Sequence, residues 1–534
     1  SLDKRITPLP SSPLIAYCSQ RLSLNKPCTP VTMVIALLLL FVTLFYFIYN
    51  HHRLISSLHN NGFSVVPSYP LIGHLSLFSS PKAFLTFGQL TRDYGDTFVI
   101  LKGKTPTVVT SNEVLIRAIC VEHFSHFHSH ASDPFDGDIS TRFDVHLFQS
   151  RGKRWKRLRT VMSSAFAMQS MNKWIDVMKT KTEIFVNRLV TDNSVDIHSL
   201  LLSHTTTVIS KCSFGEDKTE EWTNVVKFFG NEVQLNIQYM ACRGISSQTL
   251  NIAYSDCLPI ITPLISAFIS YVNNVTGCSN PLATFTQYVI LKAKNRGYSQ
   301  DPLDFLQVLK NNETDCDLRM TDEEETFEVA KSKVAKGIGR EELGAQLRFV
   351  SIAGFDTTAN TLAFLLHLLS LHPSIQQELR EELSTAEVDS LGSLPFLQSC
   401  IFECLRLFPH ASPLQSRECT SDITIGGRHF TKGIQVIVDT WTLHRNKTIW
   451  GEDAEEFNPH RFLSNPHPRA FFPFGLGPRQ CIGMRFALLE IRIFLIYFIQ
   501  RYAVIADPES TLDCSLRDTN TIWPRGLKVR FEKL

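Results

Sequence analysis

The segment that most restricts the fold of this chain is FPFGLGPRQCIG, residues 472–483, which places one cysteine among glycines. The helix-forming run MRFALLEIRIFLIYF follows at once, so Cys481 precedes the N-terminus of an expected helix. Unpaired amides and the helix dipole at that end stabilise a thiolate relative to a thiol. The glycines let the backbone approach a flat, bulky group closely. We therefore expect Cys481 to be an iron ligand, with Arg479 placed to meet an anion.

The same loop fits a family pattern. Phe474, Gly477, Arg479, Cys481 and Gly483 occur in the order F-x-x-G-x-R-x-C-x-G, which resembles the haem-binding loop of cytochromes P450. In that family the cysteine thiolate binds the haem iron. The resemblance implies haem b, iron protoporphyrin IX, as the cofactor, with Cys481 as its metal ligand. A single cysteine is more often only a small buried apolar side chain, so further motifs of the family must be found elsewhere in the chain.

A second motif lies in FVSIAGFDTTANTLAF, residues 349–364. Ala353 and Gly354 remove side-chain bulk from an expected helix, although glycine there costs about 1 kcal/mol relative to alanine. The gap predicts room for a ligand beside Asp356 and Thr357. Both side chains could instead bond back to carbonyls one turn earlier. A-G-x-D-T-T resembles the oxygen-binding helix of cytochromes P450, which implies that Thr357 lies beside bound dioxygen and that Asp356 helps to relay protons.

A third motif is a charge pair in IFECLRLFPH, residues 401–410. Glu403 and Arg406 are three residues apart, so they lie on one face of an expected helix. Surface pairs of this kind contribute little, but the apolar neighbours favour burial. The pair resembles the family's E-x-x-R, completed by an arginine that we place at Arg461. The family usually has an acidic residue where this chain has His460. The implied role is structural, locking the core beside the haem.

A fourth motif lies in RGKRWKRLR, residues 151–159, which holds six basic side chains in nine positions. A solvated polybasic face would explain the charge alone. Trp155 and Arg159 also match the family's W-x-x-x-R, whose side chains hold the haem carboxylates. Arg479 and Arg417 are expected to add donors, because the arginine fork pairs with a carboxylate at two points.

The other basic residues of this segment are expected to face an acidic electron donor. The sequence has no G-x-G-x-x-G dinucleotide fingerprint, so electrons must come from another protein. The resemblance implies NADPH-cytochrome P450 reductase as that partner, with cytochrome b5 as a further donor. A net charge of +2 argues against a general nucleic-acid-binding surface. The docking residues are expected to be Lys153, Arg154, Lys156 and Arg157.

One apolar segment stands apart from the rest. VTMVIALLLLFVTLFYFIY, residues 31–49, contains no charge and is long enough to cross a bilayer. A cleaved signal peptide is the alternative, but its apolar region would be shorter and would end at small residues. His51, His52 and Arg53 follow, which favours a cytoplasmic body. Thirteen cysteines without a CxxC pair fit a reducing compartment. We expect a single-pass protein of the endoplasmic reticulum membrane.

These observations predict four parts of the chain. Residues 1–32 form an upstream segment that we expect not to be translated, with the start at Met33. The transmembrane anchor covers residues 33–50, a linker with a proline hinge covers residues 51–70, and the cytochrome P450 catalytic domain covers residues 71–534.

The expected fold class is mainly α with small β-sheets (α+β), as in the cytochrome P450 fold. Residues 94–111 alternate like a β-hairpin, whereas residues 173–190 and 346–372 have long helical patterns. Residues 310–345 are expected to form a charged, exposed connector. Residues 255–272 are apolar but contain two prolines, so they are either a buried helix or a flap that dips into the membrane.

The expected function is insertion of one oxygen atom into an apolar small molecule (a xenobiotic, sterol or fatty-acid-like compound), with electrons from NADPH. WKRLR and LRLFP resemble the animal microsomal family 3 and its relatives most. One alternative is peroxide rearrangement without reductase, and another is a non-enzymatic haem sensor or carrier. By resemblance, the substrate pocket is expected to be lined by residues 127–148, 222–280, 410–415 and 519–526 and by Phe355 with its helix neighbours.

Overall fold

The computed structural model describes residues 30–78, 80–131, 139–189, 194–216, 281–315, 337–386, 394–465, 468–516 and 521–534. The chain divides into two units, residues 1–56 and residues 57–534. The second unit is mainly helical with small sheets, as the sequence predicts. The expected translation start cannot be examined further, since residues 1–29 lie outside the described residues.

Helices form most of the larger unit. The long helix α15 (Arg340–Leu371) packs against α8 (Ile197–Phe214), α13 (Pro281–Lys294), α17 (Pro395–Leu407) and α21 (Met484–Ile499). The other α-helices among the described residues of this unit are α3 (Leu75–Phe78), α4 (Ala83–Tyr94), α5 (Glu113–Arg117), α6 (Gly152–Ala165), α7 (Met168–Val186), α14 (Phe305–Lys310), α16 (Pro373–Leu383), α18 (Thr440–Leu443), α19 (Lys447–Trp450) and α20 (His460–Ser464).

Capping residues fix the ends of the two helices that matter most for the site. Asp196 caps α8, where its side chain accepts a hydrogen bond from the Ser199 amide, and Gly215 ends the helix in the left-handed conformation. At α15 the Glu342 carboxylate accepts a hydrogen bond from the Gly339 amide. Most residues of α15 are buried, so packing rather than propensity holds this helix in place.

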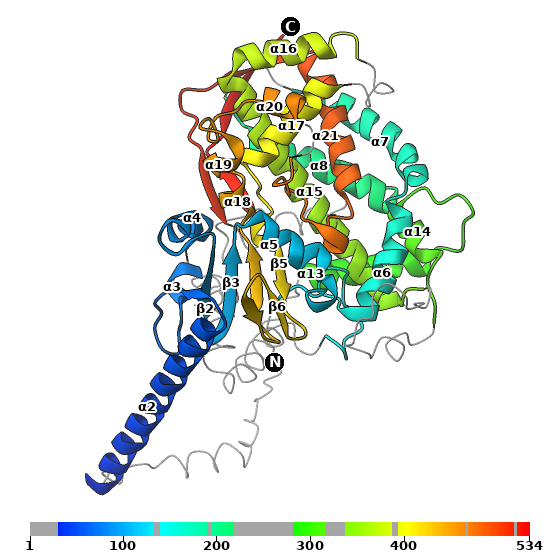
Figure 1. Ribbon diagram of the computed structural model, residues 1–534. Helices are drawn as coiled ribbons and strands as arrows, with labels where there is room; N and C mark the ends of the chain where they lie inside the picture. The colour runs from blue at the N-terminus through cyan, green and yellow to red at the C-terminus, as the bar shows by residue number, and fades with distance from the viewer. Residues whose placement is uncertain are drawn as a thin grey trace, which may run out of the picture. The chain divides into compact units, whose positions relative to one another are not determined.

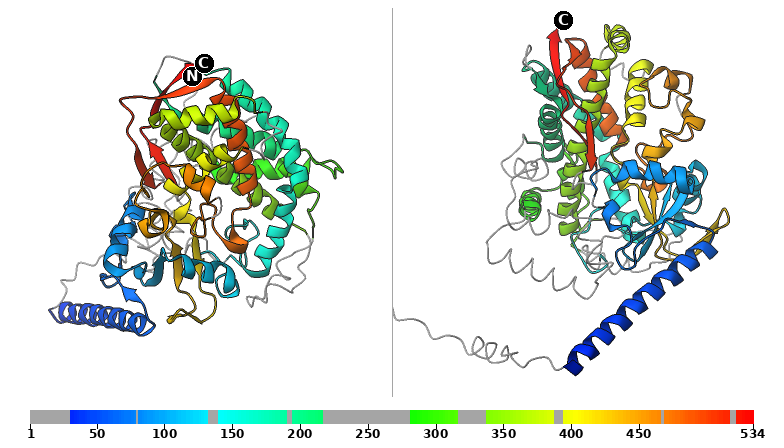
Figure 2. Two further views of the ribbon diagram at one scale, coloured as in Figure 1. Left: turned by 45° about the horizontal axis from the view of Figure 1, so that its top comes forward. Right: turned by 90° about the vertical axis from the view of Figure 1, so that its left-hand side faces the viewer.

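A five-stranded sheet has the order β1-β2-β3-β8-β5. It contains the expected hairpin, in which β2 (Thr97–Lys102) and β3 (Thr105–Thr110) pair antiparallel with Thr97 opposite Thr110. The strands lie side by side at one side of the helical body (Figures 1 and 2). The remaining strands of this sheet are β1 (Ser64–Val65), β5 (Ser416–Glu418) and β8 (Gln435–Val438).

The smaller sheets come mostly from the C-terminal part of the chain. One joins β4 (Val195–Asp196) to β12 (Lys528–Lys533) and β9 (Tyr502–Ala506). The other two are the pairs β6 (Ile423–Ile425) with β7 (Arg428–Phe430) and β10 (Asp513–Leu516) with β11 (Ile522–Arg525).

Among the described residues, the helices around the site meet in two apolar cores, and a smaller core packs α3 and α4 against the five-stranded sheet. One core gathers the C-terminal half of α15 with α17 and α21, and includes the stacked rings of Phe364 and Phe408, 4.3 Å apart. The other gathers α6, α7, α8 and α14 with the N-terminal half of α15. Side chains from both cores reach the cavity described below, among them Leu405 and Met162.

The N-terminal helix α2 runs from Pro30 to Asn60, ten residues past the expected end of the anchor. Residues 51–60 are therefore helical, and the linker expected there begins later. Leu37–Asn60 is long and apolar enough to cross a membrane, and most of its large apolar side chains from Leu37 to Tyr49 are exposed, whereas Leu58 is buried. This helix is compatible with a membrane anchor. α15 passes the same test of length and composition but is a buried core helix.

The possible flap and the charged connector lie wholly or partly outside the described residues. Residues 255–272, the possible flap, lie outside the described residues. In the expected connector, residues 316–336 also lie outside them, but residues 340–345 begin α15. Arg340 and Glu341 are exposed as expected, but residues 342–345 are buried, with Glu342 5% exposed, so this end of the connector is exposed only in part. The charge of Glu342 is retained because two arginines pair with it, as described below.

A buried acid on α21 makes a prediction about stability. Glu490 is 1% exposed, and neither of its carboxyl oxygens has a hydrogen-bond partner among the described residues. Burial raises the pKa of Glu490 well above its ordinary value, so the folded protein holds the neutral acid. In the unfolded chain the Glu490 carboxyl ionises above about pH 4.3. From there up to the pKa of the folded state, the free energy of unfolding falls by about 1.4 kcal/mol per pH unit.

We therefore expect Glu490→Gln to unfold at a higher temperature than the wild type at pH 8, with an advantage of several degrees that shrinks towards pH 5. Glutamine keeps the volume and removes the titration. The measurement is the thermal midpoint of both proteins across this pH range. Glu341→Gln, at an exposed carboxylate on α15, is the control and should show no such trend. A difference in midpoint that is the same at pH 5 and pH 8 would contradict the assignment.

Candidate active site

A mostly apolar cavity lies where α6, α15, the segment after α17, β5 and the Cys481 loop meet. Its volume is about 250 Å³. The motifs found in the sequence converge here from positions more than 300 residues apart. Of the expected site residues, those that line the cavity are Trp155, Arg159, Thr357, Arg417, Phe474, Arg479, Cys481 and Gly483.

The Cys481 loop is built by glycines and by one short helical turn. Gly475 and Gly477 both have a φ of +75°, a backbone angle that residues with a side chain rarely adopt. A Cβ on Gly477 would lie 2.0 Å from the Cys120 carbonyl oxygen, so only glycine fits this close approach. The Cys481 amide donates to the Phe474 carbonyl at 2.9 Å. The loop therefore presents the sulfur to the cavity just before α21 begins.

Two environments act on the Cys481 thiol. Burial within the protein raises its pKa, whereas the Gly483 and Met484 amides at the start of α21 and the Arg159 guanidinium lower it. The helix end thus acts in the expected direction, but burial outweighs it and the free thiol stays protonated. The side chain is nonetheless accessible, because the cavity opens onto it. A coordinating metal would deprotonate it.

The arginines at the cavity differ in how they are held. Arg479 donates from Nε to the His128 carbonyl at 2.8 Å and from Nη2 to the Ser150 carbonyl at 2.6 Å. Its guanidinium lies over the Trp155 ring, 4.5 Å from the centroid. Arg417 donates from Nη1 to the Ser416 carbonyl, but its buried Nε has no partner among the described residues.

These residues fit a haem. One wall offers a single thiol in a loop that closely approaches the cavity, and the edge offers the cations Arg159, Arg417 and Arg479. The unpaired Nε of Arg417 is a donor that a carboxylate would satisfy. Soft sulfur suits iron, and guanidinium suits the two carboxylates of the macrocycle.

Thr357 faces the cavity from α15. Its Oγ1 donates to the Ala353 carbonyl at 2.7 Å, which is the bond to the preceding turn that the sequence left open. The sequence predicted that Gly354 makes room for a ligand, but the structure gives this glycine a packing role. A Cβ there would lie 2.8 Å from Ile209 Cδ1, so the glycine lets α8 pack closely against α15. Ala353 and Gly354 still line the cavity beside Thr357.

Asp356 points elsewhere. It is 1% exposed and is not among the residues that line the cavity. Its Oδ2 accepts hydrogen bonds from Thr521 Oγ1 at 2.7 Å and from Trp523 Nε1 at 3.1 Å, and Oδ1 accepts one from Asn360 at 3.3 Å. The carboxylate thereby ties α15 to β11 and the residue before it.

The expected pocket walls are only partly those observed. Within residues 127–148 the cavity is lined by His130, Leu147 and Phe148, and within residues 410–415 by His410, Ala411, Leu414 and Gln415. Phe355 was expected there, but it is fully buried in the α6, α7 and α8 core. The described part of residues 519–526 does not line the cavity. Residues 222–280 lie outside the described residues.

The structure brings Glu403, Arg406 and Arg461 together. Arg406 holds Glu403 at two points, Nε to Oε2 at 2.7 Å and Nη2 to Oε1 at 2.8 Å, and both side chains are fully buried. Arg461 Nε donates to the same Oε1 at 3.0 Å. Arg406 Nη1 also donates to the carbonyls of His444 and Ala454. His460 instead lies 3.4 Å from the Glu378 carboxylate.

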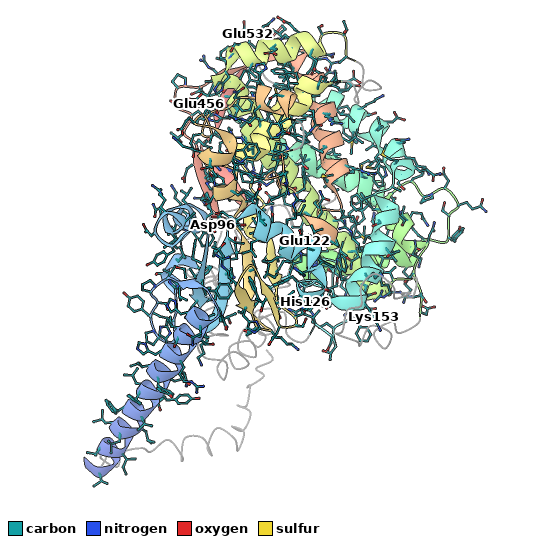
Figure 3. The ribbon with its side chains drawn as sticks, in the orientation of Figure 1. Asp96, Glu122, His126, Lys153, Glu456 and Glu532 are labelled. Carbon is teal, nitrogen blue, oxygen red and sulfur yellow. The ribbon has the colours of Figure 1, made fainter. Side chains whose placement is uncertain are left out.

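The basic segment on α6 departs from its expected role. Arg154 and Arg157 are buried and both pair with Glu342, Arg154 Nε at 2.8 Å and Arg157 Nη1 at 2.9 Å. They cannot meet an electron donor, since they join α6 to the start of α15. Lys153 and Lys156 are half-buried, and Figure 3 places Lys153 at the outer edge of α6. The docking surface expected on this helix is therefore reduced to these two lysines.

Two histidines of the cavity wall, His130 and His410, are not among the site residues that the motifs predict. His410 Nε2 lies 2.9 Å from Thr361 Oγ1 on α15. Burial and the nearby His198 lower the pKa of His410 to about 4, so its ring is neutral at pH 7. Both fall within segments expected to line the pocket. Their individual positions in the cavity wall depend on packing between segments far apart in the chain, so no local pattern could have identified them.

Comparisons with known proteins agree with this geometry. The family model of cytochrome P450 matches residues 64–526. The chain belongs to the cytochrome P450 family. It is 27% identical over 491 residues to CYP13A5 of Caenorhabditis elegans, covering 87% of this chain and 92% of that protein. It is 28% identical to cyp-13B1 of the same organism over 526 residues, covering 93% of this chain and 98% of that protein. Both relatives are named as cytochromes P450, and this P450 is accordingly a haem monooxygenase.

Proposed function

We propose that this P450 inserts one atom of dioxygen into an apolar small molecule of the xenobiotic, sterol or fatty-acid type, with electrons passed from NADPH by a reductase. The observation that carries the proposal is the cavity itself, in which Cys481 and Thr357 lie among mostly apolar side chains. A charged substrate would lose its hydration there without gaining an ionic partner outside the arginine cluster.

Haem, when bound, supplies the redox chemistry that activates dioxygen. Cys481 would hold the iron from the loop side, and Arg159, Arg417 and Arg479 would hold the carboxylates at the edge. Thr357 would hold a proton on Oγ1 within the cavity, where it can be passed to the reacting oxygen.

Other residues act by positioning. Asp356 fixes the turn that carries Thr357 through Thr521 and Trp523, so we assign it to positioning rather than to the relay expected from the motif. Glu403, Arg406 and Arg461 bind one another, and Arg406 also donates to the carbonyl of His444, whose ring accepts from the Phe472 amide at the start of the Cys481 loop. Apolar residues such as Met162 and Leu405 keep water from the reacting atoms.

The partner and the location follow from the same proposal. NADPH-cytochrome P450 reductase, with cytochrome b5 as a further donor, would dock at the α6 surface through Lys153 and Lys156. The helix α2 would anchor the protein once in the endoplasmic reticulum membrane, with the catalytic domain in the cytoplasm.

The proposal is tested by oxidative cleavage of a fluorogenic aryl benzyl ether with purified reductase, NADPH and dioxygen. We expect the wild type to form product only when all three are present. Reversing two charges with Lys153→Glu and Lys156→Glu should slow turnover by about tenfold at low ionic strength and less at high ionic strength, because surface attraction is screened by salt.

The matched control carries the same charge change outside α6, at the exposed side chains of Lys447 and Lys528. It should turn over at the wild-type rate. Turnover driven by added peroxide bypasses the reductase and should be unchanged in both double variants. An equal loss of peroxide-driven turnover in the α6 variant would rule out docking as the cause, and product formation without reductase would contradict the proposed electron source.

A further inference from the structure

His130 occupies the part of the cavity wall where the arginines gather. Its ring stacks on Phe148, with the centroids 4.0 Å apart. Nδ1 lies 2.9 Å from the Ser416 carbonyl oxygen. A carbonyl can only accept a hydrogen bond, so Nδ1 carries the hydrogen and Nε2 is left with a lone pair. The ring is held in place on two sides while the residue remains part of the cavity wall.

Three cations face this ring from three elements. Arg417 comes from β5, with Nη1 3.5 Å from His130 Nδ1, Arg479 comes from the turn before Cys481, and Arg151 precedes α6. Burial first, and then these guanidinium groups, hold the pKa of His130 well below its ordinary value. Glu418, which follows Arg417 on β5, is paired with Arg151 at 2.9 Å. The ring is therefore neutral as the structure stands.

An anion in the cavity would reverse this balance. Each carboxylate that enters offsets one guanidinium charge, and an imidazolium beside a carboxylate is stabilised rather than repelled. Neutral His130 would instead present the Nε2 lone pair to that carboxylate, which is repulsive. The ring can satisfy both neighbours only as a cation, with Nδ1–H donating to Ser416 and Nε2–H donating to the anion.

We propose that His130 is a pH-dependent anchor of the haem: it takes up one proton from solvent when the haem carboxylates enter, and donates a hydrogen bond from Nε2 to one of them. This inference rests on the proposed haem site. Binding of the cofactor then includes uptake of one proton, so the protein holds haem more tightly at low pH than at high pH. Arg159, Arg417 and Arg479 keep their charge throughout this range and give a constant contribution.

The test measures haem loss from the ferric holoenzyme to excess apomyoglobin between pH 6 and pH 9. We expect the wild type to lose haem about tenfold faster at the high end, the change that one lost charge-assisted hydrogen bond of about 1.4 kcal/mol produces. His130→Arg keeps a permanent cation and should lose haem slowly at every pH. His130→Phe keeps the stacking on Phe148 without a donor and should lose haem quickly at every pH.

His126→Phe is the matched control, because His126 bonds to Ser421 and does not line the cavity. It should follow the wild-type curve. A flat wild-type profile, or a His130→Phe profile as steep as the wild type, overturns the proposal. The reduced, carbon monoxide-bound spectrum of each protein separates the two levels: a thiolate-type band in every variant keeps the haem site intact whatever His130 does, whereas its absence from the wild type would contradict the haem site itself.

Discussion

Replacing Cys481 by serine is expected to abolish the red-shifted absorption band that reduced, carbon monoxide-bound cytochromes P450 show. Cys481 carries the sulfur on the loop wall of the cavity, and its backbone amide donates to the Phe474 carbonyl just before α21 begins. A serine hydroxyl fits the same space but stays protonated and donates little charge to iron. Because the amides of Gly483 and Met484 remain, the loop should keep its shape and only the ligand should change.

The measurement is the difference spectrum of the purified variant, taken beside its total haem content. Cys514→Ser is the control, since this partly buried cysteine on β10 lies outside the cavity. It should keep the band at the wild-type position and size. A Cys481→Ser protein with an unchanged band would show that another side chain holds the iron, and the assignment of the loop would be wrong.

The sequence predicted best those features that depend on residues only a few positions apart. The glycines that shape the Cys481 loop, and the i, i+3 pair of Glu403 with Arg406, are each set within a few residues of chain. Such local patterns fix backbone conformation and helix face directly. The fold class followed in the same way from helical periodicity and from the hairpin of β2 and β3.

Partners far along the chain could not be predicted in this way. The sequence predicted that Arg154 and Arg157 lie at the surface, because Glu342, which pairs with them, comes more than 180 residues later. Asp356 read as a proton relay because Thr521, its partner, comes 165 residues later. A buried polar group is defined by its hydrogen-bond partners, and those are set by tertiary packing rather than by the motif that contains the residue.

The packing around the glycine in α15 also could not be predicted from the local sequence. Gly354 reads as space for a ligand, yet Ile209 of α8 fills the position next to it. A missing side chain indicates a close approach but does not tell what approaches. Its neighbour Thr357 does reach the cavity, so the helix serves both its packing against α8 and the site.

Thr357→Ala is expected to divert electrons from product into hydrogen peroxide. In the structure the Thr357 hydroxyl lies at the cavity wall and donates its one hydrogen to the Ala353 carbonyl. Rotation about the Cβ–Oγ1 bond would turn that hydrogen towards the reacting oxygen, while the bond to Ala353 keeps it in reserve. Alanine keeps the helix and removes that group. Delivery of a proton by a positioned side chain accelerates a step by about 10²-fold or more, so its loss should lower the yield of product per NADPH consumed by at least about tenfold.

The yield is measured with the fluorogenic ether, reductase and NADPH, with hydrogen peroxide assayed in the same reaction. Thr357→Ser restores a hydroxyl at the same backbone position and should recover most of the wild-type yield, which a loss of helix packing alone would not. Haem content and the carbon monoxide spectrum should be the same in all three proteins, because Thr357 does not lie on the Cys481 loop. If the Ala variant keeps the wild-type ratio of product to NADPH, the hydroxyl has no part in oxygen activation and its bond to Ala353 serves only the helix.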